Sequence, residues 1–310
     1  MLISVVICTW NRAPLLDATL HAMCKLTIPV NVEWELLIVN NNCSDATDEV
    51  ISRYKADLPI RRLFEPKQGL SHARNHALEA AKGELLLWTD DDVLVDNQWL
   101  TTYVKAAKTY PEAVFFGGRI SPLFSVAPPR WLTTNQSIFY GAYALKEPGK
   151  NIFIAKPDDD IPIGANMAFC KRAFTDFRFD PNLGRCGKNF ISGEEAQLFR
   201  KLLNNGYFGI WVDTAQVWHH IPPARLTRRY IWNYYRGYGE SQARMHYELD
   251  IATDTIVLAE LHRKFRKKIL KSLRLMFFQN RRWAVAFQAS AITKGMLDAL
   301  HTQQNNQKLS

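Results

Sequence analysis

The fold of this chain is decided by the stretch Leu85-Leu86-Leu87-Trp88-Thr89-Asp90-Asp91-Asp92. Its apolar part predicts a buried strand, and three carboxylates follow where that strand ends. Open α/β sheets bind their ligands at the carboxyl ends of their strands. Adjacent carboxylates repel one another and raise each other's pKa unless a cation neutralises them, so the triplet predicts a divalent metal site. A solvated acidic turn is the alternative interpretation.

The first part of the chain alternates between strand-like and helix-like periodicity. The expected strands are 3–8, 34–39, 61–64 and 84–89, and the expected helices are 13–24, 44–54 and 70–82. This order predicts a mainly parallel sheet with helices on both faces. Polar residues follow the strands, among them Thr9, Asn11 and Arg12 after the first and Asn40 to Asn42 after the second. We expect these strand ends to form one crevice that suits a nucleotide.

The chain lacks the glycine-rich sequences that usually hold phosphates. Neither the dinucleotide fingerprint nor a P-loop occurs, which argues against redox cofactors and against ATP hydrolysis by the usual routes. A nucleotide bound at these strand ends would therefore need a metal to neutralise its diphosphate. Sugar-nucleotide transferases use a metal in place of a glycine-rich turn in this way.

Four ordered motifs resemble those of the family 2 glycosyltransferases of GT-A fold. They are residues 4–12 (SVVICTWNR), 37–45 (LIVNNNCSD), 69–75 (GLSHARN) and the aspartate triplet. The resemblance spans roughly the first two thirds of the chain and continues in residues 164–169 (GANMAF), 179–184 (FDPNLG) and 193–198 (GEEAQL). It implies a Rossmann-like mixed, mainly parallel sheet flanked by helices, with a helical C-terminal extension.

On the donor side, the resemblance implies a nucleoside-diphosphate sugar, UDP- or GDP-linked, and Mn²⁺ or Mg²⁺ as the cofactor. In the family, the cation bridges the two phosphates of the donor. Depending on the register of the triplet, Asp92 or Asp91 would bind it, and His219 matches the late histidine that many such enzymes add. The donor contacts implied are Thr9, Asn11, Arg12, Asn41, Asn42, Arg74, Asp90 and Asp91. Asparagines replace the family's acidic pair after the second strand, so the nucleotide stays open.

On the acceptor side, Glu194 and Glu195 begin a helix expected over 194–204, where the family carries a Glu-Asp pair. In an inverting transferase, one carboxylate accepts the proton of the attacking hydroxyl. The resemblance implies Glu195 as this base, with Glu194 as the alternative. Two acids that only complement a helix dipole are the other interpretation. Acceptor contacts are assigned to Gly164, Asn166 and Arg225.

The net charge of +9 comes from one segment near the C-terminus. Residues 262–282 contain nine Lys and Arg residues and no acid, with apolar residues at helical spacing between them. This pattern predicts a basic amphipathic helix that suits an anionic membrane surface. The competing interpretations are a nucleic-acid partner and a helix with a solvated basic face. We expect peripheral membrane association and no nucleic acid.

Length and composition set the remaining expectations. A chain of 310 residues with 47% hydrophobic content supports a catalytic GT-A domain over 1–225 and a helical extension over 226–310. The nucleotide-sugar half would end near residue 120 and the acceptor half would follow. No secretory leader and no long apolar run are present, and five cysteines, an odd number, fit a reducing compartment. These features predict the cytoplasm, at the cytoplasmic face of the membrane.

The combined expectation is a metal-dependent, inverting glycosyltransferase that acts on a saccharide or lipid-linked acceptor in surface polysaccharide or glycan biosynthesis. A nucleotidyltransferase of related topology is the first alternative, but it should carry a Gly-rich basic loop after the first strand. A basic nucleic-acid-binding protein is the second, and it leaves the aspartates and glutamates without a purpose.

Overall fold

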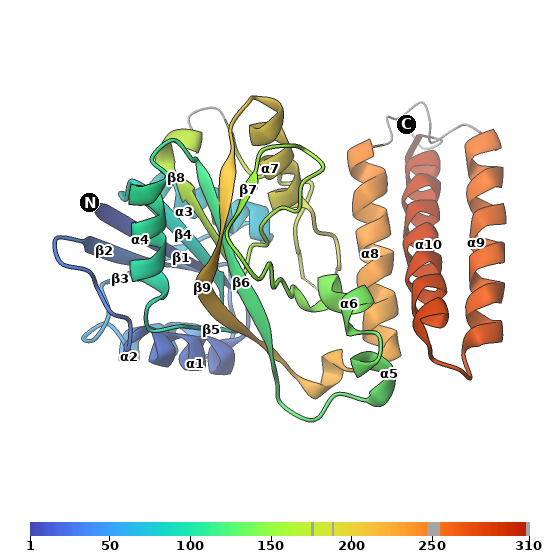
Figure 1. The fold of residues 1–310 in the computed structure, drawn as a ribbon, viewed down its shortest axis with the longest axis horizontal. Coiled ribbons are helices and arrows are strands. Elements are labelled where there is room, and N and C mark those ends of the chain that lie inside the picture. Colours follow the sequence, from blue (N-terminus) through green and yellow to red (C-terminus); the bar gives the residue numbers. More distant parts are fainter. Residues whose placement is uncertain (175–176, 188, 247–254, 308–310) are drawn as a thin grey trace. The chain divides into compact units, whose positions relative to one another are not determined.

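The computed structural model describes residues 1–174, 177–187, 189–246 and 255–307, which form two compact units (Figure 1). Unit 1 comprises Met1–Leu123, Ala144–Asn182 and Glu194–His220, and unit 2 comprises Phe124–Tyr143, Leu183–Gly193 and Ile221–Ser310. Each unit is therefore built from three separate segments of the chain.

Unit 1 contains most of the sheet and the helices that cover it. Its strands are β1 (Leu2–Thr9), β2 (Glu33–Asn40), β3 (Ile60–Phe64), β4 (Leu85–Asp90), β5 (Val93–Val95), β6 (Phe115–Phe124), β7 (Ile152–Ile154), β8 (Asn166–Cys170) and β9 (Gly209–Ile221). Its helices are α1 (Ala13–Met23), α2 (Thr47–Arg53), α3 (Leu70–Ala80), α4 (Trp99–Thr109), α7 (Glu194–Asn204) and the 3₁₀ turn η2 (Lys171–Phe174). The expected strands and helices of the first 90 residues are thus present, with ends that differ by at most three residues.

These strands form one nine-stranded mixed sheet with the order β3-β2-β1-β4-β8-β6-β9-β5, and β7 pairs with β9. Strands β3, β2, β1 and β4 are parallel, whereas β8 runs antiparallel to β4 and to β6. The parallel strands align their carboxyl ends, since Cys8 is in register with both Val39 and Asp90. The predicted α/β class with a mainly parallel first half is confirmed.

Two hydrophobic clusters cover the two faces of the sheet. Alternate residues of β1 point to opposite faces, so Ile3, Val5 and Ile7 join one cluster and Val6 joins the other. The first cluster includes residues of α1, α2 and α4, and the second includes residues of α3 and α7. Helices therefore shield both faces and leave the strand ends as the place where polar side chains can gather.

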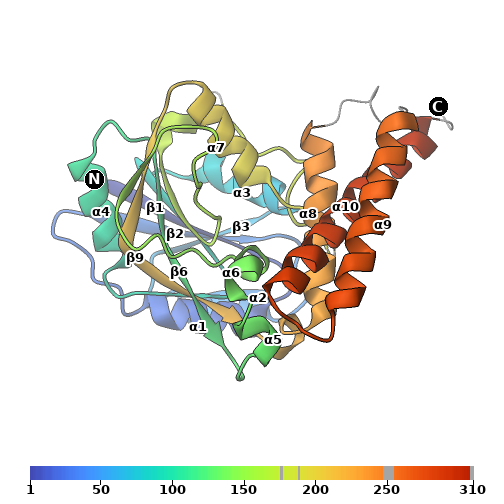
Figure 2. The ribbon, with the colours of Figure 1, turned by 45° about the vertical axis from the view of Figure 1, so that its right-hand side comes forward.

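Unit 2 is mainly helical. Its elements are α5 (Arg130–Thr133), α6 (Gln136–Phe139), α8 (Arg228–His246), α9 (Thr255–Leu275), α10 (Arg281–Gln307) and the 3₁₀ turns η1 (Tyr140–Tyr143) and η3 (Pro223–Arg225). Helix α10 packs against both α8 and α9, and Figures 1 and 2 show the three side by side. Within the described residues, no helix combines the length and apolar character needed to cross a bilayer.

The basic segment differs from the single helix that its pattern predicts. Helix α9 ends at Leu275 and α10 begins at Arg281, with a turn over residues 276–280 between them. Gln279 has a φ of 46°, which interrupts a right-handed helix, and the Asn280 side chain accepts a hydrogen bond from the backbone N–H of Trp283 at 3.1 Å. Local cap geometry thus ends one helix and starts the next.

Candidate active site

The aspartate triplet meets the first strand at its carboxyl end, inside unit 1. Thr9 Oγ1 at the end of β1 donates to Asp91 Oδ2 at 2.7 Å. Arg12, which precedes α1, donates through Nη1 to Asp91 Oδ1 at 3.0 Å and to Asp92 Oδ2 at 3.1 Å. Asp91 and Asp92 are each only 3% exposed, so one guanidinium charge is shared between two buried carboxylates.

A histidine that is distant in the sequence joins this cluster. Strand β5 pairs antiparallel with β9, which places His219 opposite Val93, the residue after Asp92. His219 Nε2 lies 3.3 Å from Asp92 Oδ1, and both side chains are buried. The sheet pairing therefore brings together the aspartate and the histidine that the resemblance implies as metal ligands.

Asp91 and Asp92 have different surroundings. Both Asp91 oxygens accept hydrogen bonds, from Thr9 and Arg12, while Asp92 accepts from Arg12 through Oδ2 and faces His219 through Oδ1. Burial raises the pKa of Asp91 to about 6, with Arg12 opposing and Asp92 adding to the shift. Burial and the neighbouring Asp92 also raise the pKa of Asp90. Three carboxylates so close together favour an added cation, which would lower these pKa values again.

The geometry of Asp92 and His219 fits a divalent cation that shares its coordination with a ligand. Two donor atoms on one octahedral cation, each about 2.1 Å from it, lie about 3 Å apart, close to the 3.3 Å separation found here. Across the described part of the chain, no group of three or more His, Cys, Asp or Glu side chains is arranged to hold a metal. Mg²⁺ in phosphate sites is typically held by one or two carboxylates plus the substrate phosphates, so a two-residue pair is compatible with such a shared site.

The loops after β1 and β2 are tied to each other and to α3. Asn11 Oδ1 accepts from the backbone N–H of Ser44 at 2.7 Å, and the exposed Asn11 and Asn42 both adopt positive φ, 52° and 60°. Asn41 is buried, and its Oδ1 accepts from Gly69 N at 2.8 Å at the start of α3. Asn41 thus ties the end of β2 to the start of α3, whereas Asn42 is exposed to solvent.

Arg74 of α3 forms the second charged centre of unit 1. Its Nη1 donates to Glu194 Oε1 at 2.7 Å and to Glu195 Oε2 at 3.4 Å, at the start of α7. Its guanidinium also lies over the ring of Phe179, 5.3 Å from the centroid. Arg74, predicted on the donor side, therefore pairs with the two glutamates, although the Asp90 charge also acts on it.

The two glutamates differ in exposure and in ionisation. The Glu194 side chain is 3% exposed and that of Glu195 is 19% exposed. Burial, with the charge of Glu195, raises the pKa of Glu194 well above its ordinary value. Burial opposes ionisation of Glu195 too, but the charge of Arg74, a hydrogen bond with the Glu194 side chain and backbone hydrogen bonds at Glu195 and Gly164 overcome it, so the pKa of Glu195 is lowered. Glu195 is the carboxylate that stays ionised and can be reached from solvent.

The predicted acceptor residues have three different environments. A side-chain carbon on Gly164 would lie 2.1 Å from Arg74 Nη2, so only glycine lets Arg74 occupy its place. Asn166 is fully buried, and its amide uses all of its hydrogen-bonding positions within the core, with the partners Trp99, Tyr103, Arg119 and Ala215. Direct contact of Asn166 with an acceptor is therefore not supported. Arg225 belongs to unit 2, where it lies 6.0 Å from the ring of Tyr230.

Two residues that support the site were missed in the sequence. Thr19 on α1 donates to the backbone carbonyl of Asp91 at 3.0 Å. Asn75 exchanges two hydrogen bonds with the backbone of Phe179, at 2.8 and 3.0 Å, and so holds the ring that lies against Arg74. Asn75 stands inside the motif at residues 69–75, so the signal was present, but nothing local to Thr19 indicated its role.

Comparison with known sequences identifies the family. Residues 4–177, more than half of the chain, match the model of glycosyl transferase family 2. The chain belongs to the family 2 glycosyltransferases. The strand ends, the aspartates and the α3 motif all lie within the matched residues. The suspected family and the enzyme class are thus confirmed.

Similar proteins include a glucuronosyltransferase and a protein of succinoglycan biosynthesis. A glucosyl-dolichyl phosphate glucuronosyltransferase of Haloferax volcanii is 23% identical over 249 residues, which are 79% of this chain and 76% of that protein. The succinoglycan biosynthesis protein ExoM of Rhizobium meliloti is 26% identical over 132 residues, only 42% of either chain.

Solved structures of similar fold cover almost the whole chain. The mannosyltransferase PcManGT of Pyrobaculum calidifontis, in complex with GDP-Man and Mn²⁺, has a TM-score of 0.57 at 18% identity and covers 99% of this chain and 75% of its own. TarS 1-349 of S. aureus, in complex with UDP-GlcNAc, has a TM-score of 0.54 at 15% identity and covers 100% and 92%. The GT-A fold is thereby confirmed.

Proposed function

We propose that this family 2 enzyme transfers one sugar, with inversion, from a nucleoside-diphosphate sugar to a hydroxyl of a saccharide or lipid-linked acceptor. The observation that carries the proposal is the presence, in one unit, of two charged centres with complementary chemistry. Asp92 and His219 offer cation ligands, and Glu195 offers an ionised carboxylate. Cation ligands suit a diphosphate, and an ionised carboxylate suits an attacking alcohol.

Mn²⁺ or Mg²⁺ would be held by Asp92 and His219, and when bound it would neutralise charge on the departing diphosphate. Asp91 supports this arrangement through Thr9 and Arg12, which orient its carboxylate. Asp90 ends β4 and the exposed Asn42 follows β2, so both lie at the carboxyl ends of parallel strands. We assign these two residues to the donor's nucleoside. A structural neighbour holds GDP-Man with Mn²⁺ and another holds UDP-GlcNAc, which supports a nucleotide sugar here without choosing the nucleotide.

Glu195 is the proposed base. The acceptor oxygen attacks the anomeric carbon, its proton passes to a Glu195 oxygen, and the bond from that carbon to the diphosphate oxygen breaks as the nucleoside diphosphate leaves. Arg74 keeps Glu195 ionised before the attack, while Glu194, more deeply buried, holds the guanidinium in place. Arg74 and Glu194 are therefore positioning residues in this scheme.

The acceptor and the cellular location are proposed from the remaining features. A relative acts on a dolichyl phosphate sugar and another is a succinoglycan biosynthesis protein, so a lipid-linked or polysaccharide acceptor in glycan biosynthesis is favoured. The basic segment 262–282, in α9 and at the start of α10, favours peripheral attachment to an anionic membrane, at its cytoplasmic face. We assign the catalytic function to residues 1–225 and membrane attachment to residues 226–310.

The deciding experiment is a screen of nucleoside-diphosphate sugars for release of nucleoside diphosphate, with Mn²⁺, with Mg²⁺ and with a chelator. We expect release with at least one sugar and its loss on chelation. Glu195→Gln should lower turnover about 100-fold or more while donor binding stays unchanged. Wild-type turnover in this variant would refute the base. Release of inorganic pyrophosphate from a nucleoside triphosphate and a sugar phosphate would instead identify a nucleotidyltransferase.

A further inference from the structure

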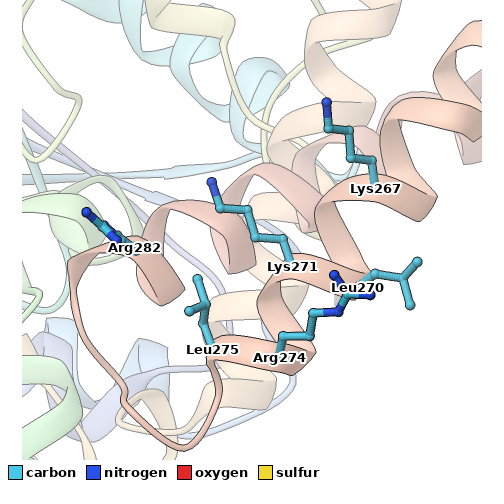
Figure 3. A pocket seen from close by; sticks show the side chains of 6 residues that line it. All are labelled: Lys267, Leu270, Lys271, Arg274, Leu275 and Arg282. Carbon is cyan, nitrogen blue, oxygen red and sulfur yellow. The ribbon is translucent and has the colours of Figure 1, made fainter.

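The end of the α9–α10 hairpin carries a cluster of cations around a pocket within unit 2. The pocket measures about 510 Å³ and is lined by Lys267, Leu270, Lys271, Arg274, Leu275 and Arg282. Figure 3 shows that these side chains come from successive turns of α9 and from the start of α10. The lining contains no carboxylate, and in the described part of the chain none of its four cations forms an ion pair. The pocket is therefore suited to an anion.

Large apolar side chains are exposed beside this pocket. Leu270 and Leu273 are each 53% exposed on α9, and Phe277 and Phe278 in the turn are 86% and 70% exposed. Exposed aromatic residues in a cluster are unusual on a surface that meets only water. Cations and exposed apolar side chains therefore occur together within residues 267–282, here called the hairpin tip.

The turn that presents the two phenylalanines is held by hydrogen bonds. Phe278 N donates to Leu275 O at 3.0 Å, and Asn135 Nδ2 donates to Gln279 O at 2.8 Å. Asn280 caps the first turn of α10. The exposure of Phe277 and Phe278 is thus imposed by the fold, and no rearrangement is needed to present them to a partner.

We infer that the hairpin tip docks on a membrane, where the pocket receives the phosphate headgroup of an anionic phospholipid and Phe277 and Phe278 enter the acyl-chain boundary. Lys and Arg are attracted to the negative leaflet surface, and aromatic side chains gain by leaving water at that depth. This inference deepens the membrane attachment proposed above by naming its site and its ligand.

Charge alone would also suit a nucleic acid, but the apolar half of the surface distinguishes the two partners. Leu270, Leu273 and Phe277 would remain exposed to water against a phosphate backbone, because duplex DNA offers polar edges and charged oxygens. A bilayer offers both phosphates and hydrocarbon within a few ångströms. The mixture of side chains therefore favours the bilayer.

The test is co-sedimentation of the full chain with vesicles of phosphatidylcholine alone or with phosphatidylglycerol added. We expect binding only to vesicles that contain phosphatidylglycerol. Lys271→Gln/Arg274→Gln and Phe277→Ser/Phe278→Ser should each lower the affinity about tenfold or more. The charge-matched control is Lys105→Gln/Lys108→Gln on α4, and the exposed-apolar control is Val30→Ser, since Val30 is also 86% exposed. Both controls should bind as the wild type does.

Three results would overturn the inference. The first is that Phe277→Ser/Phe278→Ser binds phosphatidylglycerol vesicles as tightly as the wild type does, and the second is that the wild type binds both vesicle types equally. The third is that the protein binds duplex DNA or inorganic phosphate but no vesicles. Release of nucleoside diphosphate with a soluble acceptor, measured on the same variants, separates this site from catalysis. Unchanged release together with lost vesicle binding supports the inference. If the wild type binds anionic vesicles but releases no nucleoside diphosphate, the proposed function fails and the docking site stands.

Discussion

Arg74 Nη1 lies 2.7 Å from Glu194 Oε1, and this contact joins residues 120 positions apart in the sequence. Both side chains are at most 4% exposed, so water cannot take the place of either partner in this ion pair. The same guanidinium lies 3.4 Å from Glu195, which is more exposed. Arg74 thus links a buried acid, whose pKa is raised, to an accessible one, whose pKa is lowered.

Removal of the Arg74 charge should change the pH dependence of the enzyme. Because the folded protein lowers the pKa of Glu195, the base is ionised above that pKa and activity falls only as the pH drops through it. In Arg74→Met, the pKa of Glu195 should rise, the acid limb of kcat/KM should move to higher pH, and activity at neutral pH should fall about tenfold or more. The pH–rate profile measures both effects.

Two further variants control this prediction. Arg74→Lys keeps a charge, so it should restore much of the acid limb. Arg119→Met removes a guanidinium that pairs with Asp213 at 2.6 Å, and it should leave the profile unchanged. If the acid limb of Arg74→Met coincides with that of the wild type, Arg74 does not set the ionisation of the base.

Gly164→Ala should displace Arg74. The added carbon would lie 2.1 Å from Nη2, so the guanidinium must leave Glu195 or the backbone must shift, at about 1–3 kcal/mol. We expect lower turnover, a destabilised protein in urea unfolding, and the same movement of the acid limb as in Arg74→Met. Gly141→Ala is the control, since its added carbon meets only ordinary contacts, at 3.5 Å and beyond. A fully active, stable Gly164→Ala enzyme would contradict the tight contact.

Asp92→Asn should weaken Mn²⁺ binding more than Asp91→Asn does. Asp92 approaches His219, whereas Asp91 bonds to Thr9 and Arg12 and acts by orientation. A lost supporting partner typically costs about 10- to 100-fold in metal affinity, and a lost ligand costs more. Calorimetric titration of Mn²⁺ with nucleoside diphosphate present measures the order, with the exposed Asp57→Asn as the control. Equal losses of Mn²⁺ affinity would contradict the assignment, and a larger loss in Asp91→Asn would reverse it.

Asn166→Ala should affect stability and not acceptor binding. The change leaves two buried donors, Trp99 Nε1 and Tyr103 Oη, without their shared acceptor. Each unsatisfied buried group costs about 1–3 kcal/mol, so the free energy of unfolding should fall by about 2–6 kcal/mol. Urea unfolding measures this loss, and Asn205→Ala, at an exposed amide, should change little. A raised acceptor KM with unchanged stability would restore the acceptor role.

Local patterns in the sequence determined the first half of the fold. Strand β4 was predicted because four apolar residues precede the aspartates, and α7 was predicted with the bounds it has because its periodicity is local. The end of α9 at Leu275 was not predicted, since Gln279 reverses the backbone inside a continuous helical pattern. Periodicity reports which face is apolar and does not report a single residue's φ.

The sequence alone determined that acids, a histidine and an arginine exist in motifs with family-like order. Only the tertiary structure decided their partners: His219 reaches Asp92 because β9 pairs antiparallel with β5, and Arg74 reaches Glu194 because α3 and α7 cover the same face of the sheet. It also decided that Asn166 is a core residue. Spacing along a chain constrains neighbours within one element, whereas contacts between elements depend on which strands pair and which helices share a face.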